Sequence, residues 1–372
     1  MHIDDILKIA YKIKASDIHL KVGRPPTYRI HGKLVPVKDL SPLTNEDMQN
    51  ISDTVLNDLK KKEFKEKLEV DCAYGIEGVG RFRVNLFYQR GNISGVFRTI
   101  PTDIPDIDTV NLPAVIKKIA MEERGLVLVT GITGSGKSTT LASMINYINQ
   151  NKQAHILTIE DPIEFIHKDI KCVINQREIG ADTLSFANAL RAALRQDPDI
   201  ILVGEMRDLE TVETALEAAE TGHLVMSTLH TLNAKETINR IISMYPPHHQ
   251  QQVRMQLAGV IKGVISQRLI VKKDGKGRVP ACEILRTSAR VRDCIMNKEK
   301  TSELEDAMVQ GHVTYGMQTF DMSLLDLYQR GLITFEEAMK NAEKPDDFAL
   351  KAQGITDASD ALGSDDNEIT KF

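Results

Sequence analysis

The chain has 372 residues, is 42% hydrophobic and 27% charged, and carries a net charge of −5, an ordinary balance for a protein with two domain cores. The acidic balance argues against nucleic acid as the main partner, because phosphate binding needs a basic face. The four cysteines form no C-x-x-C pair, which argues against a zinc ligand set or a disulfide framework and is typical of reduced thiols in a cytosolic protein.

Residues 1–100 are expected to form a small α+β domain. The start lacks the basic and apolar regions of a signal peptide, and no apolar run is long enough to span a bilayer. Apolar spacing predicts a helix at 3–14, and the charge-rich stretch 45–68 is also expected to be helical. Alternating patterns and turn residues predict a strand at 16–20, a hairpin at 28–37, and further strands at 70–76, 81–88 and 93–100.

The next segment, residues 101–112, is rich in proline and is expected to be a linker. Residues 113–354 then alternate strand-like and helical patterns, which favours an α/β domain with a mostly parallel sheet covered on both faces. Its strands are expected at 126–130, 155–159, 200–203 and 224–228. After residue 246 we expect mainly helices, interrupted by a hairpin of 269–273 and 279–285. Residues 355–372 are acidic and are expected to form a flexible tail.

A phosphate-binding loop is predicted between the apolar strand 126–130 and a helical stretch that follows it. Gly131 to Ser138 matches G-x-x-x-x-G-K-S/T in the strand–loop–helix context that the motif requires. Backbone N–H groups and the helix N-terminus would face the phosphates. Lys137 would reach the β and γ phosphates, and the Ser138 hydroxyl would bind Mg²⁺. The predicted nucleotide-binding residues are Gly131, Thr133, Gly134, Ser135, Gly136, Lys137, Ser138 and Thr139.

Three more catalytic candidates follow strands of the predicted sheet. Glu205 ends the apolar strand after Asp199 and is the candidate for the metal and its water. Glu164 follows strand 155–159 and is the candidate to polarise the attacking water, although shaping the loop is the alternative for this acidic segment. His230 follows strand 224–228 at the same sheet edge and could contact the γ-phosphate; a structural role is its alternative.

Together these residues resemble the secretion and pilus ATPase superfamily. Gly131–Ser138 is similar to its Walker A motif, 159–164 to its Asp box, 199–208 to its Walker B motif and 227–230 to its His box. Within it the chain resembles the PilT/PilU branch of pilus retraction ATPases. The amino-terminal part is short, no tetracysteine insert is present, and 15–20 and 80–85 are similar to that branch.

The resemblance implies a PAS-like amino-terminal domain, a RecA-like ATPase domain and a homohexameric ring that couples Mg-ATP hydrolysis to pilus retraction. It implies a cytoplasmic place at the inner face of the inner membrane. The partners would be an inner-membrane platform protein and a paralogous pilus ATPase, with no nucleic acid. It also suggests that Arg81, Arg83 and Arg98 close over the γ-phosphate. Arg81 and Arg83 would share one strand face and Phe82, Val84 and Leu86 the other, while a solvated arginine face is the alternative.

One segment departs from the retraction branch. Members of that branch often carry A-I-R-N-L-I-R-E, and residues 290–297 here match it at Arg292 and Ile295. The stretch 315–321 is similar to PilU, so an accessory PilU-like ATPase is one alternative. A RecA-like nucleic-acid translocase is another; it should show a basic channel with stacking aromatics, and this chain has no Trp. A scaffold that binds ATP without cleaving it would have lost Lys137, Glu164 or Glu205, and all three are present.

Overall fold

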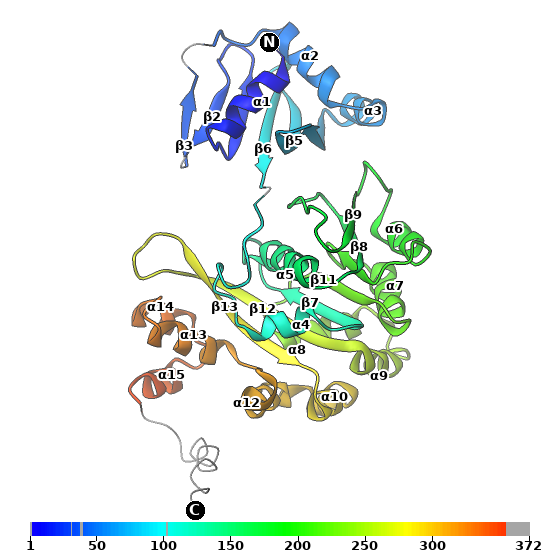
Figure 1. The fold of residues 1–372 in the computed structure, drawn as a ribbon, viewed down its shortest axis with the longest axis vertical. Coiled ribbons are helices and arrows are strands. Elements are labelled where there is room, and N and C mark those ends of the chain that lie inside the picture. The colour runs from blue at the N-terminus through cyan, green and yellow to red at the C-terminus, as the bar shows by residue number, and fades with distance from the viewer. Residues whose placement is uncertain (1, 31, 38–39, 102, 355–372) are drawn as a thin grey trace, which may run out of the picture. The chain divides into compact units, whose positions relative to one another are not determined.

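The computed structural model describes residues 2–30, 32–37, 40–101 and 103–354. The expected acidic tail, 355–372, lies outside the described residues. Figure 1 draws the fold, and contacts divide the chain into two compact units. The first comprises Met1–Ile104, Thr158–Asp169 and Ile174–Ala189, and the second comprises the remainder. Within the described ranges, no helix combines the length and the apolar character that a membrane crossing requires.

The first unit contains a six-stranded sheet in the order β3-β2-β1-β6-β5-β4. All five pairings in this sheet are antiparallel. The strands are β1 (Asp17–Lys21), β2 (Thr27–Ile30), β3 (Lys33–Pro36), β4 (Glu69–Ile76), β5 (Gly80–Gln89) and β6 (Asn92–Ile100). The strands and hairpin predicted for this part of the chain are confirmed, with ends displaced by a few residues.

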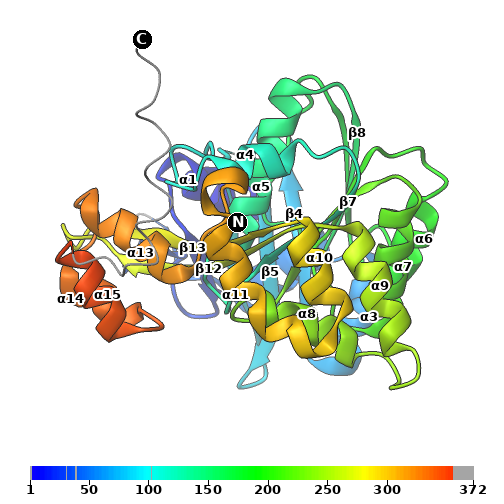
Figure 2. The ribbon, with the colours of Figure 1, turned by 90° about the horizontal axis from the view of Figure 1, so that it is seen from below.

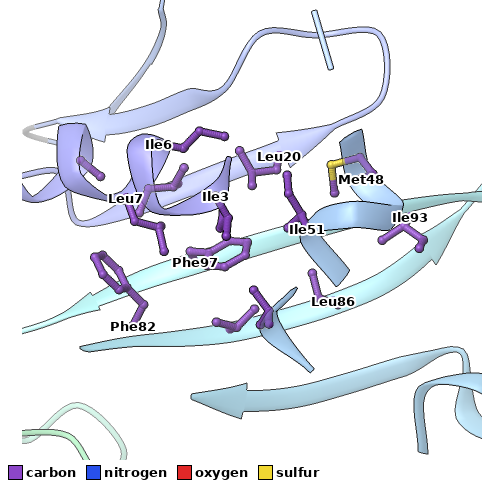
Figure 3. Close-up of a cluster of buried hydrophobic side chains, with 14 of the residues drawn as sticks. Ile3, Ile6, Leu7, Leu20, Met48, Ile51, Phe82, Leu86, Ile93 and Phe97 are labelled. Carbon is purple, nitrogen blue, oxygen red and sulfur yellow. The ribbon is translucent and has the colours of Figure 1, made fainter. Parts of the chain in front are cut away.

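Helix α1 (Ile3–Lys12) packs on this sheet through one apolar face. Ile3, Ile6 and Leu7 are buried because their spacing puts them on the same side of the helix. Figure 3 shows them in one cluster with sheet residues such as Phe82 and Phe97. Phe82, Val84 and Leu86 of β5 are buried, as the alternation along this strand predicted.

The helical stretch predicted for 45–68 is confirmed, but it is divided into two helices. They are α2 (Asn45–Val55) and α3 (Asp58–Lys67). Leu56 between them is extended and buried, with 3% of its surface exposed. The Asn57 side chain accepts the Lys60 N–H at 2.9 Å and so caps the second helix. Burying Leu56 in the core and capping at Asn57 break the helix here.

The second sheet has seven strands in the order β13-β12-β7-β11-β10-β8-β9. β7 pairs in parallel with β11 and β12, β10 pairs in parallel with β11, and only the β12–β13 hairpin among these pairs is antiparallel. The strands are β7 (Gly125–Thr130), β8 (His155–Glu160), β9 (Val173–Glu178), β10 (Ile200–Val203), β11 (Leu224–Leu229), β12 (Ile261–Val271) and β13 (Arg278–Arg286). The four strands predicted for this sheet from alternation are confirmed, whereas β9 was not predicted.

Helices flank this sheet and follow its hairpin. They are α4 (Val115–Ala120), α5 (Lys137–Asn151), α6 (Phe186–Ala193), α7 (Leu209–Glu220), α8 (Ala234–Ser243), α9 (Gln250–Val260), α10 (Ala289–Met296), a 3₁₀ helix (Lys298–Glu303), α11 (Leu304–Gln310), α12 (His312–Tyr315), α13 (Phe320–Gln329), α14 (Phe335–Asn341) and α15 (Pro345–Ala352). The predicted hairpin is confirmed but longer, since β12 begins directly after α9. Figure 2 shows α13 and α14 beside this hairpin, on which they pack.

Candidate active site

The predicted phosphate loop lies between the end of β7 and the start of α5. β7 is buried along its whole length, as expected for a central parallel strand. The backbone turns at Gly131, where φ is 139° and a Cβ would lie 2.5 Å from the Gln267 carbonyl oxygen. Gly134 and Gly136 also have positive φ, at 79° and 94°. Glycine is therefore required where the loop passes closest to β12.

Two side chains of this loop have buried polar atoms. Lys137 Nζ donates to the carbonyl oxygens of Gly131 at 2.8 Å and Ile132 at 3.1 Å. Ser135 Oγ is buried and has no hydrogen-bond partner among the described residues. A buried hydroxyl without a partner is costly unless a ligand satisfies it. The loop therefore offers a donor and a cation to a group with anionic oxygens.

The eight predicted nucleotide-binding residues lie on the loop and on the first turn of α5. The tip at Thr133 and Gly134 is exposed, whereas Ser138 and Thr139 at the start of α5 are half-buried. The N-terminus of a helix attracts anions because its first N–H groups have no partner within the helix. The hydroxyl of Ser138 is a hard oxygen ligand of the kind Mg²⁺ prefers. These features fit a nucleotide phosphate chain and its metal ion.

Glu205 and His230 come together at the ends of two neighbouring strands. His230 Nε2 lies 3.2 Å from Glu205 Oε1, and Arg207 Nε lies 2.8 Å from Glu205 Oε2. The Met206 N–H donates to the Thr228 carbonyl oxygen at 3.2 Å, which ties the two strand ends together. The structure thus brings Glu205 and His230 together at one sheet edge, and Arg207 is a further partner of Glu205 that the sequence did not indicate.

The acidic segment after β8 is organised by Glu160. Its carboxylate accepts the Thr158 hydroxyl at 2.7 Å and the Glu164 N–H at 3.4 Å. Burial raises the pKa of the Glu160 carboxyl above its usual range, while these hydrogen bonds oppose the rise. Glu164 itself is exposed. Glu160 therefore shapes the loop, and Glu164 is the carboxylate of this pair that is open to solvent.

Two polar residues of β9, which the sequence did not indicate, hold the same loop in place by hydrogen bonds. Gln176 Nε2 donates to Glu160 Oε1 at 3.1 Å and to the Phe165 carbonyl oxygen at 2.9 Å. Glu178 is buried, and its Oε2 accepts the Ile163 N–H at 3.2 Å. The sequence carries little signal for this strand, because Val173 and Ile174 are followed by four polar residues, so 173–178 shows neither an apolar run nor an apolar–polar alternation.

The three candidate arginines lie on β5 and β6. Arg83 and Arg98 face each other in register, and Arg83 is exposed. Arg98 Nε donates to Asp17 Oδ1 at 2.9 Å. Arg81 is paired with Glu178, with 3.0 Å between a guanidinium nitrogen and a carboxylate oxygen. Two of the three arginines thus have carboxylate partners. The partner of Arg81, Glu178, also accepts the Ile163 N–H.

No cluster of three His, Cys, Asp or Glu side chains that could hold a metal ion occurs in the part of the chain that the structure describes. A Mg²⁺ ion that is bound with substrate phosphates usually has one or two protein ligands. Ser138 and Glu205 supply a hydroxyl and a carboxylate of that kind.

Residues 108–340 match the family described as type II/IV secretion system protein. The chain is 47% identical to the type IV pilus retraction ATPase PilT of Pseudomonas aeruginosa over 94% of its own length and 100% of that protein. It is 40% identical to the type IV pilus ATPase PilU of the same organism, over 98% of this chain and 95% of PilU. A crystal structure of the pilus retraction motor PilT with bound ADP superposes with a TM-score of 0.85 at 49% identity, covering 93% of this chain and 98% of that one.

Proposed function

Because the chain belongs to the type II/IV secretion system protein family, we propose that it is a P-loop ATPase that drives retraction of type IV pili. The observation that carries this proposal is the similarity to PilT along nearly the whole length of this chain and of PilT. The phosphate loop and the contact between Glu205 and His230 support it. The work would be done at the cytoplasmic face of the inner membrane, against a platform protein of the pilus machine.

The phosphate loop would hold the nucleotide. Its N–H groups and the Ser135 hydroxyl would donate to phosphate oxygens, and Lys137 would exchange its carbonyl partners for the β and γ phosphates. Ser138 would bind Mg²⁺ directly, and Glu205 would hold it through a water molecule. When bound, Mg²⁺ supplies positive charge that offsets the charge of the phosphates.

Glu164 would accept a proton from the attacking water, since it is exposed while Glu160 is engaged in the loop. His230 would donate to the γ-phosphate and, through its contact with Glu205, report the loss of that group. Domain closure favoured by ATP and lost after phosphate release would then convert hydrolysis into movement.

Arg83→Ala is expected to lower kcat by about tenfold or more while leaving ADP affinity nearly unchanged, because ADP lacks the phosphate that the guanidinium would grip. Exposure of Arg83 beside Arg98 supports this role. Steady-state phosphate release and nucleotide titration measure the two quantities. Arg24→Ala, at an exposed position of the same unit, is the control and should keep wild-type activity. If Arg81→Ala, Arg83→Ala and Arg98→Ala each turn over ATP at near wild-type rates, the amino-terminal sheet takes no part in hydrolysis.

We expect six subunits in the working particle, each amino-terminal domain contacting the ATPase domain of a neighbour. The resemblance to the family motivates this expectation. Light scattering at micromolar concentration with saturating Mg-nucleotide should give about 250 kDa, six times the 41.6 kDa of the chain. The Lys276→Ala variant, altered at an exposed hairpin tip, should give the same mass. A monomer under these conditions would contradict the ring.

The function itself is tested by deleting the gene for this chain and counting surface pili. A retraction motor predicts more pili and no twitching, both reversed by the wild-type gene, whereas an extension motor predicts loss of pili.

An accessory PilU-like role is the second candidate, favoured by the similarity to PilU over 98% of the chain. In that case a paralogous ATPase would still retract unloaded pili after the deletion. Retraction against the load of an optical trap would then be the step that fails.

A further inference from the structure

A row of three buried polar side chains crosses neighbouring strands of the second sheet. Ser266 of β12 is in register with Thr130 of β7 on one side and Glu283 of β13 on the other. Thr130 Oγ1 donates to Ser266 Oγ at 3.0 Å, and Ser266 Oγ donates to Glu283 Oε1 at 3.2 Å. Thr130 directly precedes the first glycine of the phosphate loop. One end of the row therefore lies at the strand that enters this loop.

The other end of the row lies at the start of α8. Glu283 Oε1 accepts the N–H of Ala234, the first residue of that helix, at 2.6 Å. A negative charge is stabilised there by the helix dipole and by a charge-assisted hydrogen bond. The preceding loop is fastened to the same helix, because the Leu232 N–H donates to Glu236 at 3.0 Å. The hydroxyls of Thr231 and Thr237 also lie 2.7 Å apart.

We propose that Glu283 is a positioning residue for ATP hydrolysis, which holds the His230 loop in place relative to the strand that enters the phosphate loop. The inference rests on the ATPase function proposed above. Glu283 would not touch the nucleotide; it acts through Ala234 on one side and Ser266 on the other. His230, four residues before Ala234, contacts Glu205 at 3.2 Å, so a displaced α8 would disturb that pair.

The charge of this carboxyl changes near neutral pH. Burial raises the pKa of Glu283 to about 7, and the negative charge of Glu343 adds to the rise. The Ala234 N–H, the Ser266 hydroxyl and the Arg268 guanidinium oppose it. Arg268 is itself paired with Glu343, with 2.7 Å between the two side chains. Only the ionised form makes the charge-assisted bond to Ala234, so the positioning should weaken as the pH falls through about 7.

Glu283→Gln tests the proposal, because glutamine keeps the shape and an acceptor oxygen but stays neutral. At about pH 8 the variant should lose roughly tenfold in kcat with little change in KM for ATP, as expected when a group that only orients an active residue is weakened. At about pH 6, where wild-type Glu283 is mostly protonated, the two proteins should have nearly equal kcat. The component of the kcat–pH profile with its midpoint near 7 should be absent from the variant.

Glu343→Gln is the matched control, since it makes the same chemical change beside Glu283. It should keep wild-type kcat at about pH 8 and retain the pH step. The midpoint should move to lower pH, because a neighbouring negative charge has been removed.

Thermal unfolding separates positioning from a merely structural role. Because the pKa of Glu283 is raised in the folded state, its contribution to stability is present at low pH and is lost as pH rises through about 7. Glu283→Gln avoids this loss. As the pH rises from about 5 to about 8, the Tm of the variant should therefore increase relative to that of the wild type, while its kcat should decrease relative to the wild-type kcat. A merely structural role predicts that Tm and kcat fall together.

Wild-type kcat in Glu283→Gln at about pH 8, or a pH step that persists in that variant, would overturn the positioning role. A wild-type protein without ATPase activity would overturn the ATPase proposal as well, so the two failures are distinguishable.

Discussion

Lys137→Ala is expected to reduce ATP turnover to below about 1% of the wild-type rate, because it removes the cation that stabilises charge on the transferring phosphate. The structure places Lys137 Nζ within the loop, 2.8 Å from the Gly131 carbonyl oxygen, and the side chain is buried. Steady-state phosphate release measures the loss. The fold should survive, since the phosphate loop is fixed by its glycines and by the strand and helix on either side of it.

Lys276→Ala is the control for this prediction, because it removes a lysine from an exposed hairpin tip of the same unit. It should retain full activity. Circular dichroism should give matching spectra for both variants and the wild type. If Lys137→Ala keeps more than a few per cent of the wild-type rate, the active site has been placed wrongly.

Glu164→Gln is expected to bind Mg-ATP with near wild-type affinity but to hydrolyse it at least about a hundredfold more slowly, because a general base typically contributes 10² to 10⁴ in rate. The exposed position of Glu164 on the loop held by Glu160 and Gln176 supports this role. Glu205→Gln should instead weaken Mg-ATP binding, since Glu205 is assigned to the metal ion and its water. Titration with a fluorescent ATP analogue and single-turnover assays measure binding and cleavage separately.

Glu217→Gln makes the same chemical change at an exposed position of α7 and should leave both quantities unchanged. Weak nucleotide binding in Glu164→Gln together with intact binding in Glu205→Gln would reverse the two assignments.

Most strands could be predicted because each carries its own local signal. Along β5 the buried Phe82, Val84 and Leu86 alternate with polar residues, and β7 is an apolar run before a glycine loop. The break between α2 and α3 could not be predicted from periodicity. It depends on Leu56 finding a place in the core and on the cap that Asn57 provides, and the first of these is a tertiary effect.

The positions of the candidate catalytic residues could be predicted because these residues lie next to strand ends. Glu205 and His230 meet since β10 and β11 are parallel neighbours, and parallel strands end at the same sheet edge. The supporting residues carried no such signal. Gln176 and Glu178 lie on a polar strand that reads as a loop, and Glu283 lies 49 positions from Ala234, whose N–H it accepts.

If hydrolysis at this phosphate loop powers pilus retraction, the dependence should be visible in single labelled pili of cells that carry only Glu164→Gln. The variant should form the ring and bind ATP, so pili should extend normally and then fail to retract, while cells carrying Glu217→Gln retract at wild-type speed. Retraction at wild-type speed in the Glu164→Gln cells would show that movement does not depend on hydrolysis at this site.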